Sequence, residues 1–135
     1  MEALPPILPY LTVRDARAAL GFCEAAFDGE ILMIQEQDGA VNHARARIQG
    51  GIVMFYEERA GAYEGNGAPA TLGGSPVAIR LDLGTAEAVD ATFARALAAG
   101  ATEVVAPLDR PWGRLAEVRD PEGHLWRLAA SAAEQ

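Results

Sequence analysis

The stretch "GRLAEVRDPEGHLWRLA" (residues 113–129) predicts two strands joined by a tight turn. The turn is Asp120-Pro121-Glu122-Gly123, in which Pro121 presets the backbone of the second position and Gly123 supplies conformational freedom at the fourth. The strand after the turn carries a charge, Arg127, among apolar neighbours. An arginine that faces the interior needs a partner, so the other strands decide what Arg127 does.

A second strand–turn–strand unit, "ARIQGGIVMF" (residues 46–55), matches "AEVRDPEGHLW" (residues 116–126) and belongs to a longer repeat. Both halves of the chain predict the order strand, helix, strand, strand, strand. Phe22 and Gly29 recur as Phe93 and Gly100, at the same offset of 71 residues. Such self-similarity is a signal at the level of the fold. In the first half the predicted strands are 7–13, 30–36, 41–48 and 52–58, with a helix capped by Asp15; in the second they are 76–83, 102–106, 114–119 and 124–129, with a helix capped by Thr85.

Composition narrows the class of protein. The chain has 135 residues, 50% of them hydrophobic, and a formal net charge of −8, which disfavours binding to nucleic acid or to an anionic membrane. The one cysteine, Cys23, excludes an internal disulfide and fits a reducing compartment. The N-terminal "MEALPPILPY" lacks the pattern of a secretory signal, so we expect a cytoplasmic protein.

Five segments carry a resemblance to a known family: "PYLTVRDARAALGF" (9–22), "NHARARI" (42–48), "LGGSPV" (72–77), "ALAAGATEVV" (96–105) and "RDPEGHLWRLA" (119–129). With the repeat, they resemble the vicinal oxygen chelate superfamily of glyoxalases, bleomycin-resistance proteins and extradiol dioxygenases, and within it the PhnB-like branch. The resemblance implies an α+β fold in which two βαβββ modules form one eight-stranded cup with helices outside. It also implies a single glyoxalase-like domain over 1–135, with module 1 at about 1–60, a linker at 61–73 and module 2 at about 74–135.

The resemblance also implies where a metal would bind. Metal-dependent relatives place His, Glu or Gln at four strand positions that correspond here to Leu8, Met54, Pro76 and Arg127. Two of these residues are apolar, one is proline and one is a cation, so none suits a divalent ion. We therefore expect no metal and no cofactor, and no metal-dependent lyase or dioxygenase activity. A different metal site made of His43, Glu117 and Asp82 stays open.

Strand alternation predicts which side chains face the cup. Arginines grip carboxylates and phosphates in a bidentate manner, and aromatic side chains wall small-ligand pockets. The alternative is that the arginines are neutralised internally, Arg127 by Glu117 and Arg80 by Asp82. The candidate ligand-binding residues are Tyr10, Arg45, Met54, Tyr56, Arg80, Trp112 and Arg127.

These residues predict a small-molecule-binding protein that holds a planar or anionic ligand in the cup. The alternative is a metal-free enzyme that uses Glu117 or His43 as acid or base. A third reading is a dimer whose cleft is vestigial. We expect Cys23, on an apolar helix face, to be a buried and inert thiol. The expected partners are a small-molecule ligand and a second copy of the chain, with no nucleic acid and no membrane.

Overall fold

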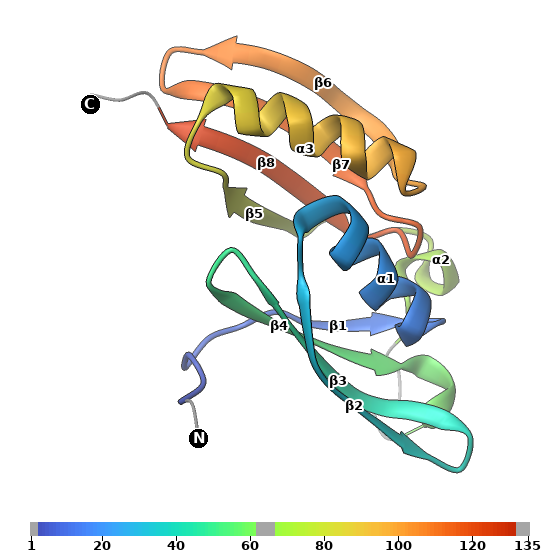
Figure 1. Ribbon diagram of the computed structural model, residues 1–135. Helices are drawn as coiled ribbons and strands as arrows, with labels where there is room; N and C mark the ends of the chain where they lie inside the picture. The colour runs from blue at the N-terminus through green and yellow to red at the C-terminus, as the bar shows by residue number, and fades with distance from the viewer. Residues whose placement is uncertain (1–2, 62–66, 132–135) are drawn as a thin grey trace.

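The chain folds into two sheets of four strands, and one long helix packs against each sheet (Figure 1). The computed structural model describes residues 3–61 and 67–131. The first unit comprises β1 (Tyr10–Val13), α1 (Ala16–Phe27), β2 (Glu30–Gln37), β3 (Ala40–Ile48) and β4 (Gly51–Glu57). The second comprises β5 (Ala78–Asp82), α3 (Ala86–Ala98), β6 (Thr102–Arg110), β7 (Gly113–Arg119) and β8 (Leu125–Ser131).

The two sheets have the same topology. Their strand orders are β1-β4-β3-β2 and β5-β8-β7-β6, so β5 holds in the second sheet the place that β1 holds in the first. The pairs β1–β4 and β5–β8 are parallel, and the other pairs are antiparallel. The predicted α+β fold of two βαβββ modules is confirmed. The eight strands form two separate hydrogen-bonded sheets and not the one eight-stranded sheet that was predicted, because β1 and β5 pair only within their own units.

Helix caps and strand alternation explain most of these elements. The side chain of Asp15 accepts a hydrogen bond from the Ala18 amide, and Thr85 does the same for Ala88, as predicted for N-caps. Strand β6 is longer than the predicted 102–106 because it continues through Pro107. A proline is tolerated there because β6 is an edge strand and its pairing with β7 is irregular.

The described part of the predicted linker, residues 61–73, contains a short helix. Residues 62–66 of this linker lie outside the described residues. Residues 1–2, at the start of predicted module 1, and 132–135, at the end of predicted module 2, also lie outside them. A 3₁₀ turn, η1 (Glu58–Ala60), precedes that gap, and a short helix, α2 (Pro69–Leu72), follows it. The carboxylate of Glu58 accepts hydrogen bonds from the Ala68 amide at 2.7 Å and the Thr71 hydroxyl at 2.9 Å, which anchors α2 to the end of the first unit.

The core is continuous between the two units. Helices α1 and α3 lie side by side, and buried apolar residues of both units form one cluster. The rings of Phe27, at the end of α1, and Trp126, in β8, are 4.8 Å apart between centroids. Trp126 is fully buried, so this contact ties the first helix to the second sheet.

The turn between β7 and β8 is stabilised by its own first residue. Asp120 Oδ1 accepts hydrogen bonds from the amides of Glu122 and His124, both at 2.9 Å, and Oδ2 accepts one from the indole nitrogen of Trp126 at 2.8 Å. Burial raises the pKa of Asp120, although these donors oppose the shift. Gly123 has a φ of +94°, and a Cβ atom there would lie 2.9 Å from Pro69 of α2, so only glycine fits.

Two buried carboxylates hold this turn and β4 against the start of α1. Glu122 accepts from the Arg14 amide at 2.7 Å and the Asp15 amide at 3.1 Å. Glu57 accepts from the Ala16 amide at 2.8 Å. We call Glu57 and Glu122 with these three amides the carboxylate clasp. The clasp satisfies N–H groups that have no partner within the helix, and negative charge is favoured at a helix N-terminus.

Glu57→Gln tests the clasp. Burial alone would raise the pKa of Glu57, but the Ala16 and Val41 amides and the Arg59 guanidinium outweigh it and lower that pKa. The ionised side chain therefore stabilises the fold above its ordinary pKa of about 4.3, and this contribution is lost as the pH falls through the lowered folded-state value. We expect Glu57→Gln to cost about 1–3 kcal/mol at pH 7 and to flatten the acid limb of the stability curve.

The measurement is urea unfolding between pH 3 and 7. Glu24→Gln, an exposed change on α1, is the control and should follow the wild type. A Glu57→Gln curve parallel to that of the wild type at every pH would contradict this account of Glu57.

Candidate functional site

Two adjoining cavities lie between β5 and the first unit: the larger lies beside β1 and the segment before it, and the smaller lies beside the turn that joins β3 to β4. The larger has a volume of about 620 Å3 and the smaller about 220 Å3. Both are lined by Pro9, Ile79 and Arg80, so Arg80 stands where the two meet. The wall of the larger is mostly apolar, which is usual for a small-ligand site, and its polar residues are few. Its other lining residues include Ile7, Leu8, Tyr10, Ser75, Val77 and His124.

Strand β5 aims Arg80 away from the core. Leu81 is buried in the core, whereas Ala78, Arg80 and Asp82 occupy the opposite face of the strand. In the register of the second sheet Arg80 lies beside Arg127 of β8, and Arg127 lies beside Glu117 of β7. Two guanidinium groups and one carboxylate thus share a row on the inner face.

Only one of the two arginines has a charge partner. Arg127 Nη2 lies 3.3 Å from Glu117 Oε2, and the Glu117 side chain is only 8% exposed. This is one of the two internal pairs considered from the sequence. The other, between Arg80 and Asp82, is absent, because Asp82 Oδ1 accepts from the Gly84 amide at 3.1 Å instead. Within residues 3–61 and 67–131, Arg80 makes no hydrogen bond or ion pair.

On the inner face of the first sheet, His43 is held between two side chains. Arg45 Nε lies 3.0 Å from His43 Nε2, and Tyr10 Oη lies 2.8 Å from His43 Nδ1. Arginine has no acceptor, so Nε2 must accept, and the proton of the neutral ring lies on Nδ1 and is donated to Tyr10. Burial, and then the Arg45 charge, lower the pKa of His43, which keeps the ring neutral at pH 7.

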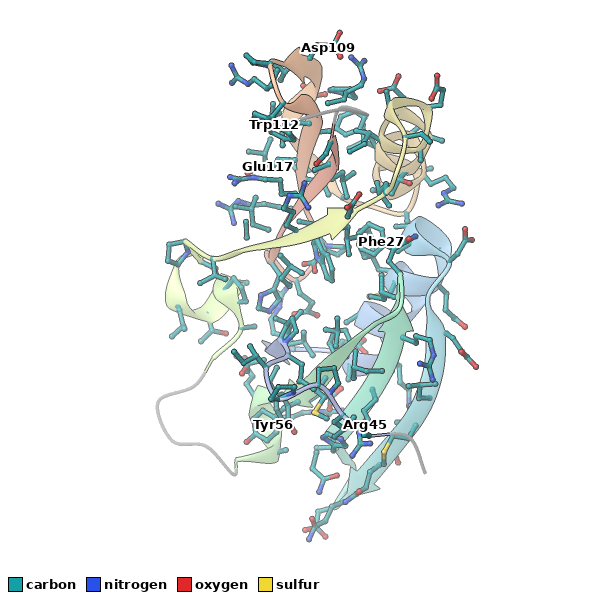
Figure 2. All side chains as sticks on the ribbon, turned by 90° about the vertical axis from the view of Figure 1, so that its left-hand side faces the viewer. Phe27, Arg45, Tyr56, Asp109, Trp112 and Glu117 are labelled. Atoms are coloured by element: carbon teal, nitrogen blue, oxygen red, sulfur yellow. The ribbon has the colours of Figure 1, made fainter. Side chains whose placement is uncertain are left out.

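The structure distributes the predicted ligand-binding residues over four places. Tyr10 and Arg80 line the larger cavity. In the register of the first sheet Met54 lies beside Tyr10, and Arg45 lies beside Met54 on its other side. Figure 2 shows Arg45 and Tyr56 on the same lower sheet. Arg127 lies on the inner face of the second sheet. Trp112 lies at the β6–β7 turn, outside the residues that line the two cavities.

Several cavity residues escaped the sequence analysis. Ile7 and Val77 fall within the predicted strands 7–13 and 76–83, but the observed strands begin only at Tyr10 and Ala78. Strand alternation therefore does not hold for Ile7 and Val77, which are 90% and 66% exposed. His124 was expected only to begin a strand, yet its Nε2 donates to the Thr12 carbonyl at 2.8 Å and its ring lines the larger cavity. The signal that could have found His124 is its place directly after the turn that contacts β1.

The residues at the four family metal positions do not fit a metal ion. Leu8 and Met54 offer no hard donor, Pro76 has no ligating side chain, and Arg127 is a cation held by Glu117. The alternative set of His43, Glu117 and Asp82 is not gathered either: in the described part of the chain no three His, Cys, Asp or Glu side chains form a metal-binding group. Cys23 is buried, and burial raises its pKa to about 12, so it is no nucleophile.

Comparison with known proteins identifies the family. Residues 4–128 match the model of the Glyoxalase/Bleomycin resistance protein/Dioxygenase superfamily, and the chain belongs to that superfamily. An uncharacterized protein of Mycobacterium tuberculosis is 42% identical over 133 residues, which cover 96% of this chain and 76% of the relative.

Two solved structures show the same fold. TioX from Micromonospora sp. ML1 is 28% identical with a TM-score of 0.68, and the match covers 97% of this chain and all of TioX. A PhnB protein from Bacillus cereus is 22% identical with a TM-score of 0.67, and the match covers 94% of this chain and all of that protein. Among the described residues, no helix has the length and apolar character needed to cross a membrane.

Arg127→Ala tests the inner-face ion pair. Removing the guanidinium leaves the Glu117 carboxylate buried without its cation, so we expect a loss of about 1–3 kcal/mol in unfolding free energy. Urea unfolding at pH 7 measures it. Arg95→Ala, which breaks the exposed pair with Asp28, is the control and should cost less than about 1 kcal/mol. A wild-type midpoint and slope for Arg127→Ala would show that the pair contributes nothing.

Proposed function

We propose that this protein binds a small molecule with a planar or apolar body and an anionic group in the two cavities beside β5, without a metal ion. The proposal rests on the position of Arg80, which lines both cavities and whose charge no other described side chain neutralises. A guanidinium in such a place is satisfied by water or by a ligand, and a carboxylate matches its fork of donors. Arg127, which Glu117 already holds, has a secondary role in this scheme.

The apolar wall supports the second half of the proposal. Leu8, Pro9 and Ile79 surround a volume of about 620 Å3, within the range of cavities that hold small ligands. Of the other predicted ligand-binding residues, Tyr10 lines the larger cavity and is part of the proposal. Arg45, Met54, Tyr56 and Trp112 line neither cavity, and their contact with a ligand stays a prediction from the sequence.

The geometry favours binding over metal-free catalysis. A general base needs a lone pair free to take a proton, but the Nε2 lone pair of His43 already accepts from Arg45. Glu117 is held by Arg127 and has no place in the lining of the two cavities. We therefore keep neither residue as an acid or base. We also propose that the chain belongs to the PhnB-like branch, which the five quoted segments support. A cytoplasmic location stays a proposal that the single cysteine supports.

Calorimetric titration with indole-3-propionate tests the proposed function. The control ligand is indole-3-propionamide, which has the same shape without the charge, and EDTA is present throughout. We expect the carboxylate to bind about tenfold more tightly or better, because a hydrogen bond to a charged group contributes about 1.5–3 kcal/mol. Arg80→Gln should abolish the difference, whereas Arg95→Gln, which removes a distant exposed charge, should preserve it. Equal affinities in the wild type, or binding that needs an added divalent metal, would overturn the proposal.

We also propose a homodimer. Ile7 and Val77 are large apolar side chains exposed beside each other on the rim of the larger cavity, with Tyr10 43% exposed next to them. Exposed apolar surface of this kind is stabilised by contact with a second copy. Sedimentation at micromolar concentration should show a species of twice the 14.2 kDa chain mass, and Ile7→Ser with Val77→Ser should shift it toward the monomer. A single 14.2 kDa species in the wild type would contradict the dimer.

A further inference from the structure

The smaller cavity carries two opposite charges on one strand. Arg80 and Asp82 both line it, and they are two positions apart on the same face of β5. Their Cα atoms are therefore separated by about 7 Å. Residues so placed can form an ion pair, yet here they do not. Asp82 Oδ1 is turned toward the Gly84 amide, and Asp82 Oδ2 has no hydrogen-bond partner among the described residues.

A positive and a negative group that face one cavity without meeting form a complement to a zwitterion. An α-amino acid carries a carboxylate and an ammonium group on one carbon, so it can bridge the two. The guanidinium of Arg80 accommodates the carboxylate in a bidentate manner, and the carboxylate of Asp82 accepts from the ammonium group.

The net charge of the chain points the same way. At −8 the protein repels a free anion, and Asp82 adds to that repulsion beside Arg80. A zwitterion has no net charge and escapes the long-range repulsion. Arg127, beside Arg80 in the same row, is already offset by Glu117. Among the described residues that line the smaller cavity, Asp82 has no cation other than Arg80 with which to share a ligand.

We infer that the ligand is an α-amino acid, or a molecule with the same zwitterionic group, whose large apolar side chain occupies the larger cavity. Arg80 borders both cavities, so a carboxylate at Arg80 places the side chain toward Leu8 and Ile79 and the ammonium group toward Asp82. This inference rests on the proposed function, since it needs the anion site at Arg80, and adds to it a second charged contact.

The test compares L-tryptophan with two analogues, one without the ammonium group and one without the carboxylate. L-Tryptophan and indole-3-propionate share the indole ring, the chain and the carboxylate, and tryptamine lacks the carboxylate. Calorimetry on the wild type should show L-tryptophan binding about tenfold more tightly than either of the other two.

The decisive variant is Asp82→Asn. Its amide oxygen can still accept from the Gly84 amide, so the turn after β5 is preserved while the charge is removed. We expect about a tenfold loss of L-tryptophan affinity, with indole-3-propionate unchanged or slightly tighter. Glu103→Gln, at the exposed start of β6, makes the same change of net charge away from the cavities and should alter neither affinity. Thermal unfolding confirms that each variant is folded.

The outcomes separate the two proposals. If indole-3-propionate binds in an Arg80-dependent manner but L-tryptophan gains nothing, or loses nothing in Asp82→Asn, the amino-acid inference is overturned and the proposed function stands. If none of the ligands binds at millimolar concentration, both are overturned.

Discussion

The fold depends on how the first turn of α1 meets two buried carboxylates from elsewhere in the chain. Glu57 comes from the end of β4, in the same unit, and Glu122 from the turn between β7 and β8, in the other. The amides of a helix start cannot stay buried without acceptors, and a buried carboxylate cannot stay charged without donors. Each therefore requires the other. Since Glu122 sits in a turn that Asp120 holds rigid, the clasp orients the second sheet relative to the first.

This orientation is what leaves room for a ligand. The clasp and the contact between Phe27 and Trp126 lie on the helix side of the molecule, whereas the two cavities lie between β5 and the first unit, one beside β1 and one beside the β3–β4 turn. The strands that carry Arg80 and Tyr10 belong to different units, so the site exists only because the units are held together. Charge is balanced unevenly across it. Arg127 and Glu117 neutralise each other, whereas Arg80 lines both cavities without a charge partner among the described residues.

The sequence was enough to predict the fold, because the features that decide it are local and occur twice. Asp15 and Thr85 marked both helix starts, and strand alternation separated the core face from the inner face. The carboxylate clasp could not be predicted from the sequence, because Glu122 lies 107 residues from Asp15, whose amide donates to it, and no periodicity links the two residues. The candidate site was half predictable. Alternation placed Arg80 on the inner face, but only the geometry shows that Glu117 neutralises Arg127 and that Asp82 does not neutralise Arg80.

The central claim is that Arg80, and not Arg127, is the cation that meets a ligand. Nitrogen-15 NMR of the arginine Nε–H groups observes both side chains at once, with Arg80→Gln and Arg127→Gln used to assign their signals. During a titration with indole-3-propionate, the account predicts that the Arg80 signal shifts and saturates while the Arg127 signal stays near its starting position. A saturating shift of Arg127 with no movement of Arg80 would contradict it.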